Sequence, residues 1–318
     1  MNQTKSRAND LTLTRLNPFL KYCKTVLKSW QLYVLILPGL IYVFIFSYMP
    51  MYGVQIAFKD YKANLGIWGS EWVGLKHFIR FINYPMFWQI LKNTFIIGLY
   101  SFATFPCAII LAVLLNELDN QRFKKVVQMI TYAPHFISTV VICGMVLLFF
   151  NRSNGVVNNL LVILGSERID FMARPEYFAD IYVWSGVWQG IGWGTIIYLS
   201  ALSGVSPEMV EAALIDGASR LQIIRHIKIP TIMPTIVIML ILSCGSILSV
   251  GFEKIFLLQN PLNLEVSQVI STYVYEIGLR GGQFSYSSSI GLFNTVVNVA
   301  MLIIVNMIAK RASDISIW

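Results

Sequence analysis

The chain has 318 residues, of which 56% are hydrophobic and 13% are charged, and its mean hydropathy is +0.64. Soluble globular domains rarely have this composition, which argues against a soluble enzyme or binding module and indicates an integral membrane protein. The net charge of +8 suits contact with anionic lipid headgroups, and nothing in its distribution indicates nucleic acid.

Six apolar stretches are each long enough to cross a hydrocarbon core of about 30 Å, which takes roughly 20 helical residues. They cover approximately residues 31–51, 93–116, 129–150, 181–203, 232–252 and 287–309. The sequence therefore predicts an all-α integral membrane protein with six transmembrane helices. A polar leader, residues 1–30, precedes a single membrane domain, residues 31–318.

The basic residues predict the orientation of the spans. With the N-terminus inside, more than half of the 24 Lys and Arg residues fall on the cytoplasmic side, so both termini of this multi-pass cell-membrane protein are expected in the cytoplasm. In the leader, Lys21, Lys24 and Lys28 share a helical face, which is typical of an interfacial helix and equally of a plain positive flank. No cleavage site for a signal peptide is evident, so the first span should stay in place.

The sequence gives no indication of chemistry on a substrate, and no catalytic, cofactor-binding or metal-binding residue is assigned. The four cysteines fit small apolar residues better than a zinc site or a disulfide framework: Cys23, Cys107, Cys143 and Cys244. The chain lacks the phosphate-binding motif G-x-x-x-x-G-K-[ST], so it is not itself an ATPase. No charged side chain falls inside the six spans, which argues against an ion-coupled carrier, and His135 is expected to pack rather than to relay protons.

The fourth span is the best candidate for a path through the membrane. Trp188 lies on one face, and Gln189 and Trp193 lie on another, with Trp193 expected near the middle of the bilayer. An indole beside an amide suits a sugar, because the ring stacks on C–H faces while the amide meets hydroxyls; anchoring and packing explain the residues equally well. Three glycines recur every four residues and predict a smooth face for helix packing: Gly186, Gly190 and Gly194.

Uncharged polar residues continue in the last two spans. Ser243, Ser246 and Ser249 lie every three residues in the fifth span, and Asn294 and Asn298 lie one turn apart in the sixth. They are expected to bond across helices or, as the alternative, to line a polar path. Hydroxyls and amides without charges favour a neutral polar solute over an ion.

The bridge between the fourth and fifth spans, residues 206–230, contains the run EAALIDGASRLQIIRHIKIP from Glu211 to Pro230. Ser206 and Pro207 predict a helix start with a hydroxyl cap. Gly217 predicts a turn, and a second short helix should follow it and end at Pro230. The sequence therefore predicts a helix, a glycine turn and a helix at the membrane surface.

At this bridge the chain resembles the permeases of ATP-binding-cassette importers. Their cytoplasmic loop carries EAA, two residues, DGA, eight residues, then I, one residue, an aliphatic residue and P. The matching positions are Glu211, Ala212, Ala213, Asp216, Gly217, Ala218, Ile227 and Pro230. The resemblance implies a type I importer permease fold whose cytoplasmic coupling helix, between spans 4 and 5, docks on an ATPase subunit through these residues.

Longer segments resemble the LplB-type branch of carbohydrate and oligosaccharide permeases. They are Leu37–Tyr61, Trp72–Phe81, Leu114–Gln128, Tyr132–Ser138, Gly251–Leu279 and Gly282–Asn298. The branch implies import of oligosaccharides or glycan fragments with an extracytoplasmic solute-binding protein, a second homologous permease in a heterodimer, and two copies of a cassette ATPase that binds ATP and Mg. An ion-coupled secondary carrier and a non-transporting membrane scaffold or sensor remain the alternatives.

Two outer segments complete the prediction. The aromatic-rich residues 61–88 are expected at the outer membrane interface, where they would help to receive the binding protein; packing alone explains them equally well. Residues 252–280 are expected to fold back between the fifth and sixth spans near an outer gate.

Overall fold

The computed structural model describes residues 29–313, and their side chains to residue 311. The chain divides into two units, Met1–Gln55 and Ile56–Trp318, and each is described by itself. The interfacial helix predicted from Lys21, Lys24 and Lys28, like Cys23, lies outside the described residues.

The described part of the first unit forms one long helical run, which continues into the first residues of the second unit. α3 (Trp30–Val43) continues through a π-helical turn, η1 (Phe44–Tyr48), into α4 (Met49–Met51) and the 3₁₀ segment η2 (Tyr52–Phe58). The whole run, Trp30–Phe58, is 29 residues long and apolar enough to cross a membrane. It contains the first predicted span.

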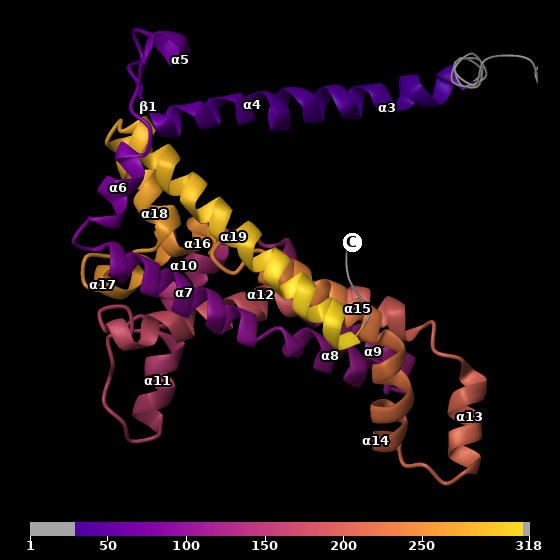
Figure 1. Cartoon of the computed structure of the whole chain (residues 1–318). Coiled ribbons are helices and arrows are strands. Elements are labelled where there is room, and N and C mark those ends of the chain that lie inside the picture. The colour runs from indigo at the N-terminus through magenta and orange to yellow at the C-terminus, as the bar shows by residue number, and fades with distance from the viewer. Residues whose placement is uncertain (1–28, 314–318) are drawn as a thin grey trace, which may run out of the picture. The chain divides into compact units, whose positions relative to one another are not determined.

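The second unit contains the remaining spans (Figure 1). Its long helices are α7 (Phe87–Ala103), α8 (Pro106–Asn116), α9 (Gln121–Tyr132), α10 (Thr139–Phe149), α12 (Phe178–Leu202), α15 (Ile229–Cys244) and α19 (Phe284–Ser313). Within residues 29–313, four helices are long and apolar enough to span a membrane, or five if the bent pair α9–α10 is one span. α12 has 25 residues, which is sufficient length, but its glycines, tryptophans and polar residues make it less apolar.

Prolines affect two of the predicted spans. The span predicted at 93–116 is confirmed within Phe87–Asn116, one apolar run long enough to cross a membrane, although a turn at Thr104 and Phe105 before Pro106, which has no N–H, separates α7 from α8. The span predicted at 129–150 as one helix is wrong. Pro134 lies in a 3₁₀ turn, η3 (Ala133–Phe136), and Ser138 is the N-cap of a new helix, α10. As a result α9 and α10 meet at an angle of 104°.

The fifth span also differs from its predicted bounds. The helix ends at Cys244, eight residues before the predicted end at residue 252, and residues 245–250 form a series of tight turns. Ser246 and Ser249 therefore lie in these turns and not on a helix.

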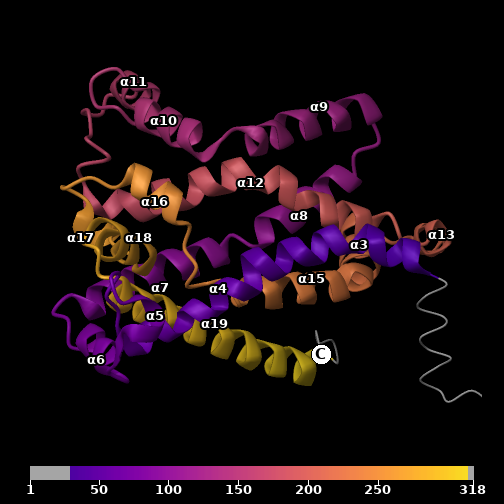
Figure 2. The same ribbon diagram turned by 90° about the horizontal axis from the view of Figure 1, so that it is seen from above.

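α12 is the central helix of the second unit. It packs against α8 and α7, against α9 and η3, and against α15, and Figure 2 shows it between the α9–α10 pair and the α7–α8 pair. Near its start, Phe178, Ile181 and Tyr182 join one core cluster with Ile97 and Ile255. Near its end a second cluster is formed by Ala112, Val113, Tyr198, Leu202 and Ile232.

The closest approaches in this bundle occur at glycines other than the three predicted, although a Cβ on Gly194 would lie 3.2 Å from Ala108 Cβ of α8, which agrees with the predicted packing face at that position. A Cβ on Gly192 would lie 2.1 Å from the Thr131 carbonyl oxygen, so α12 and α9 can only touch through a glycine there. A Cβ on Gly98 would likewise lie 2.1 Å from the Ile247 carbonyl oxygen. By contrast, a Cβ on Gly190 would meet no atom within 4 Å. The predicted smooth packing face is therefore wrong for Gly190.

Short elements cover the end of the bundle that carries the starts of α7 and α12. β1 (Lys59–Asp60) and β2 (Glu71–Trp72) form an antiparallel pair, joined by α5 (Gly66–Gly69) and followed by α6 (Lys76–Ile82). α11 (Val156–Ile163) and η4 (Pro175–Tyr177) lie between α10 and α12. The segment after α15 folds back over the bundle, as expected, in the order α16 (Phe252–Leu258), α17 (Leu264–Ser267), α18 (Ile270–Tyr275) and η6 (Glu276–Arg280).

Candidate functional site

The bridge between α12 and α15 begins with a short helix that ends at a glycine. α13 (Pro207–Ile215) starts at Pro207 as predicted, although the Ser206 side chain makes no capping bond. Gly217 has φ of +78°. Its N–H donates to the Leu214 carbonyl at 3.1 Å, and the Ala218 N–H donates to the Ala213 carbonyl at 2.9 Å. This pair of bonds is the Schellman arrangement, in which a left-handed glycine satisfies the last carbonyls of a helix.

The second half of the bridge is not a separate short helix. α14 (Arg220–Ile223) is capped by Ser219, whose hydroxyl and backbone are both bonded to Gln222. It continues through the π turn η5 (Ile224–Lys228) directly into α15. The predicted stop at Pro230 is wrong, because the wider π turn just before the proline removes the clash that its ring makes with the preceding turn.

Ion pairs connect this continuous helix to the end of α8. The Lys228 ammonium donates to Asn116 Oδ1 at 3.0 Å and forms a short ion pair with Glu117, and both side chains are mostly buried. Arg220 Nη2 lies 3.4 Å from Asp119 Oδ2, an exposed contact. Displacing η5 would therefore pull on the connection between α8 and α9.

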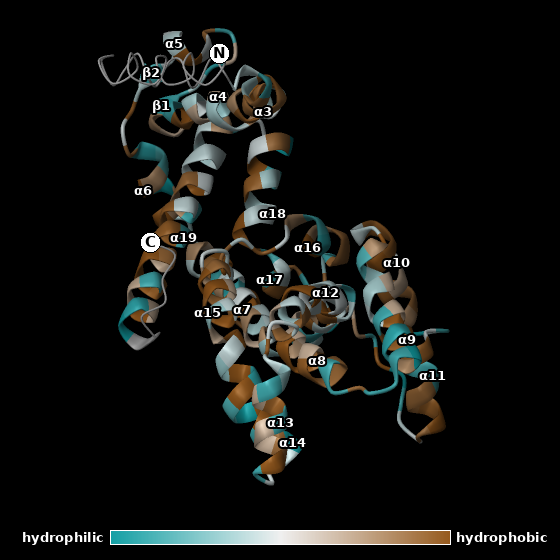
Figure 3. Ribbon diagram, turned by 90° about the vertical axis from the view of Figure 1, so that its right-hand side faces the viewer, coloured by the Kyte–Doolittle hydropathy of each residue, from teal (hydrophilic) through white to brown (hydrophobic). Residues whose placement is uncertain are grey.

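α13 itself stands clear of the bundle. Together with α14 it projects beyond the ends of α8, α12 and α15 (Figures 1 and 3). All its residues are exposed or half-buried, including Glu211, and Ile215 is 87% exposed. Apolar side chains presented in this way mark an interaction surface.

A groove opens beside α12 in the body of the bundle, with a mostly apolar lining that carries a few polar side chains. A cavity of about 550 Å³ lies between α7, α8, α12 and α15, and Gln189, Trp193 and Ser243 line it. Three of the four glycines of α12, Gly186, Gly190 and Gly194, line it too, and so leave it wide. A second cavity of about 310 Å³ shares Ser101, Thr104, Phe105, Tyr182 and Ser243 with the first, and adds Ser246 and Ser249.

The predicted path residues on α12 separate into two groups. Gln189 and Trp193 line the larger cavity; the Gln189 amide donates to the Ile137 carbonyl at 3.1 Å. Trp193 is 51% exposed and stacks one face on His135, with ring centroids 4.5 Å apart, so this histidine packs as expected. Trp188 instead lines a separate, apolar cavity with Trp184.

On α19, Asn298 ties the helix to the turns after α15. Its side chain accepts from the Leu248 N–H at 3.2 Å and donates to Ser249 Oγ at 3.0 Å, which corresponds to the cross-helix bonding expected for it. Asn294 differs, because its Oδ1 is buried without a hydrogen-bond partner among residues 29–313. The structure places neither residue in the two joined cavities.

The sequence analysis did not single out Lys254, which lies on α16 between the fifth and sixth spans and lines the larger cavity. Burial lowers the pKa of its ammonium group to about 8, so the group is mostly charged at neutral pH. The available signal was its position just after a predicted span.

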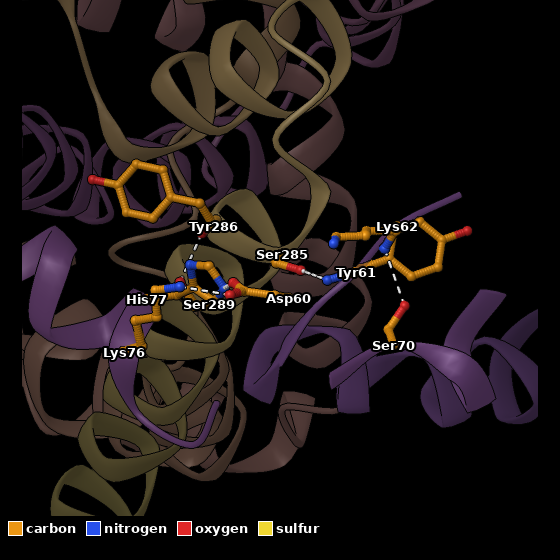
Figure 4. Close-up of polar contacts among 9 residues, drawn as sticks. All are labelled: Asp60, Tyr61, Lys62, Ser70, Lys76, His77, Ser285, Tyr286 and Ser289. Carbon is orange, nitrogen blue, oxygen red and sulfur yellow. Dashed lines mark hydrogen bonds and ion pairs between the residues drawn. The ribbon is translucent and has the colours of Figure 1, made fainter. Parts of the chain in front are cut away.

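A polar cluster joins the β1–β2 pair to the start of α19 (Figure 4). Asp60 lies 2.5 Å from the Lys76 ammonium and 2.9 Å from His77 Nε2, and the hydrogen bond from Lys76 lowers the pKa of the Asp60 carboxyl. The Tyr61 N–H donates to Ser285 Oγ at 2.8 Å. The Asp60 contacts hold β1 to α6, and the Tyr61–Ser285 bond holds the start of residues 61–88, the segment predicted to receive the binding protein, against the last span.

The binding-protein-dependent transport system inner membrane component family matches residues 104–314, which is more than half of the chain. The chain belongs to this family. The match covers α8, the bridge and the groove-lining helices α12 and α15. It confirms the resemblance to importer permeases, the all-α permease fold and a multi-pass membrane protein.

Individual relatives agree with this family assignment. The chain is 45% identical over 294 residues to the polygalacturonan/rhamnogalacturonan transport system permease protein YteP of Bacillus subtilis (strain 168), which covers 92% of both chains. It is 43% identical to protein LplB of the same organism, over 88% of both chains, which confirms the branch.

Solved structures give the same result. A permease chain of a bacterial transporter that imports the acidic polysaccharide alginate matches with a TM-score of 0.85 and 38% identity, over 92% of this chain and 99% of that one. A second structure of the alginate transporter, in complex with a pentasaccharide-bound periplasmic protein, matches equally well.

Proposed function

We propose that this chain is the membrane permease subunit of an ATP-driven, binding-protein-dependent importer of oligosaccharides or glycan fragments. The observation that carries the proposal is α13, an exposed helix with a glycine cap that presents Glu211 beyond the bundle. The relatives named for polygalacturonan and alginate transport support the sugar class.

ATP and Mg bind a separate cassette ATPase, present in two copies, and α13 docks on it. The exposed Leu214 and Ile215 supply apolar contact area, and the small Ala212 and Ala213 permit a close approach. Both chain termini and α13 then lie in the cytoplasm, as the distribution of Lys and Arg predicts.

Docking is coupled to the groove through the inner end of the bundle. Motion of α14 reaches α8 through the Lys228–Glu117 pair, and α8 contributes Ala108 to the cavity wall. The groove of this permease and that of a second, homologous permease enclose the sugar. An extracytoplasmic solute-binding protein delivers it to the end that carries residues 61–88.

The uncharged polar groups and the indole in the lining suit a sugar. The amide of Gln189 and the hydroxyls of Ser243, Ser246 and Ser249 can meet sugar hydroxyls, while the free face of Trp193 can stack on a pyranose ring. Trp188, Asn294 and Asn298 were also predicted for the path. Trp188 lines a separate apolar cavity, Asn298 bonds to the turns after α15, and Asn294 lies outside both groove cavities, so their positions favour packing over contact with the sugar.

The first experiment is gentle purification of the chain from its native membrane, followed by mass spectrometry of what stays bound. A second six-span permease and a cassette ATPase are expected. That complex, in proteoliposomes with its binding protein, should take up sugar only with ATP on the ATPase side. A chain that emerges alone, or uptake driven by an ion gradient without ATP, would refute the proposal.

A charge reversal tests the docking surface. Glu211→Arg should insert and assemble its helices normally but abolish ATP-driven uptake. Glu176→Arg, the same reversal at an exposed position before α12, is the control and should leave uptake unchanged. Equal uptake by both variants would remove α13 from the coupling path.

A further inference from the structure

α16 brings a single amine into the wall of the groove. Lys254 lines the 550 Å³ cavity, and the residue is 9% exposed. Its Nζ donates to the Tyr182 carbonyl at 2.7 Å and lies 4.9 Å from the centre of the Tyr182 ring. The ammonium is therefore held at one place on the surface of α12.

The glycine spacing of α12 makes room for this group. A Cβ on Gly186 would lie 3.1 Å from Lys254 Nζ, a separation at which one of the two would have to move. Gly186 lies one turn after Tyr182 and lines the same cavity. The position predicted to pack a helix instead seats an ammonium.

No carboxylate neutralises Lys254 in the part of the chain that the structure describes. The five ion pairs found among residues 29–313 do not include it. An ammonium has three N–H donors, and one is bonded to Tyr182. A buried cation without a counter-ion is unfavourable, and in membrane domains such groups mark substrate paths.

The surroundings define the ligand that this ammonium suits. The cavity wall near α12 offers an amide on Gln189, a hydroxyl on Ser243 and the indole of Trp193. These groups suit the hydroxyls and C–H faces of a sugar, and the ammonium adds one positive charge. A sugar ring that bears a carboxylate matches both the neutral groups and the positive charge.

We propose that Lys254 is a specificity-determining residue that binds the carboxylate of uronate units as they pass through the groove, so that the importer favours acidic oligosaccharides over neutral ones. This inference rests on the proposed importer function. The carboxylate accepts the free N–H donors of Nζ, and Gly186 keeps the ammonium positioned. The uncharged polar residues of the predicted spans favoured a neutral solute, because Lys254 fell outside those spans.

Matched probes test the inference in the assembled importer in proteoliposomes. The acidic probes are trisaccharides of galacturonate, mannuronate and glucuronate, and the neutral counterparts are their methyl esters. The wild-type importer should take up at least one acid faster than its ester. Lys254→Met should lower uptake of that acid by about 10- to 100-fold, the range for losing a hydrogen bond to a charged group, with a much smaller effect on the ester.

Three further variants separate charge from folding. Lys254→Arg keeps the charge and should recover part of the acid uptake. Gly186→Ala keeps Lys254 but crowds Nζ, so it should raise the KM for the acid more than for the ester. Lys92→Met makes the same substitution at an exposed position of α7 and should change the uptake of neither the acid nor the ester.

The outcomes separate the role of Lys254 from the importer function. Uptake of neutral sugars without any acidic probe would overturn the role of Lys254 and leave the importer function standing. Equal acid uptake by the wild type and Lys254→Met would overturn it as well. If no sugar enters with ATP, the importer function itself fails.

Discussion

Replacing Gly217 tests whether the turn after α13 is part of the coupling machinery. The residue has φ of +78°, and a Cβ there would meet no atom within 4 Å, so Gly217→Ala changes backbone preference without a clash. Alanine in the left-handed region costs about 1–2 kcal/mol, which lowers the population of the capped turn about 5- to 30-fold.

Two other substitutions bracket this effect. Asparagine tolerates the left-handed region better than alanine, so the population of the capped turn in Gly217→Asn should lie between those of the wild type and Gly217→Ala. Proline fixes φ near −65° and removes the N–H that bonds to Leu214, so Gly217→Pro should be the most severe.

The assay is sugar uptake per ATP hydrolysed by the reconstituted importer, with ATPase activity measured separately. Uptake should decrease in the order Gly, Asn, Ala, Pro, while the amount of chain inserted in the membrane stays constant. If Gly217→Ala and Gly217→Pro both transport like the wild type, the glycine cap has no role in coupling. A loss of insertion in step with uptake would instead assign the turn to folding.

Three further predictions concern the bundle and its outer face. Gly192→Ala should lower the free energy of unfolding by at least the roughly 1–3 kcal/mol typical of overpacking, and this loss should appear as a lower melting temperature of the detergent-purified importer. Gly190→Ala should leave the melting temperature unchanged, because its Cβ would meet open space. Glu117→Gln and Lys228→Met should each reduce uptake, and a double-mutant cycle should give a coupling energy of about 1–2 kcal/mol; additive effects would show that the pair is not a unit. The pKa of Asp60 is lowered in the folded protein from the ordinary 3.8. The contribution of its carboxylate to stability is therefore present above about pH 4 and lost as pH falls through the lowered pKa. The difference in melting temperature between the wild type and Asp60→Asn should shrink on acidification and disappear below that pKa.

The sequence predicted best where the signal is local. The turn at Gly217 follows from one residue that tolerates a positive φ after a helix, and the groove position of Gln189 and Trp193 follows from their spacing on α12. The break at Pro134 was missed because hydropathy measures how apolar a segment is and does not report its direction. The stop at Pro230 was wrong because a π turn relieves a proline clash that a strict α-helix would retain.

The remaining errors arise from tertiary contacts. Periodicity identified a glycine face on α12, but only the neighbouring backbone shows that Gly192 carries the tight contact. Asn93 and Thr94 were not recognised, although Asn93 donates to the Glu265 and Gln268 carbonyls and Thr94 accepts the Ile270 N–H. These bonds join residues more than 170 positions apart in the chain, which no local pattern reports.

The unbroken helix from Arg220 to Cys244 makes the bridge and the fifth span one lever. Its 25 residues extend about 37 Å at 1.5 Å per residue. One end is at Arg220, which contacts Asp119, and Ser243, near the other end, lines the groove. A tilt imposed at α14 therefore reaches the groove wall without a soft joint at Pro230 to absorb it, and the turns at residues 245–250 lie beyond the point where the force is delivered.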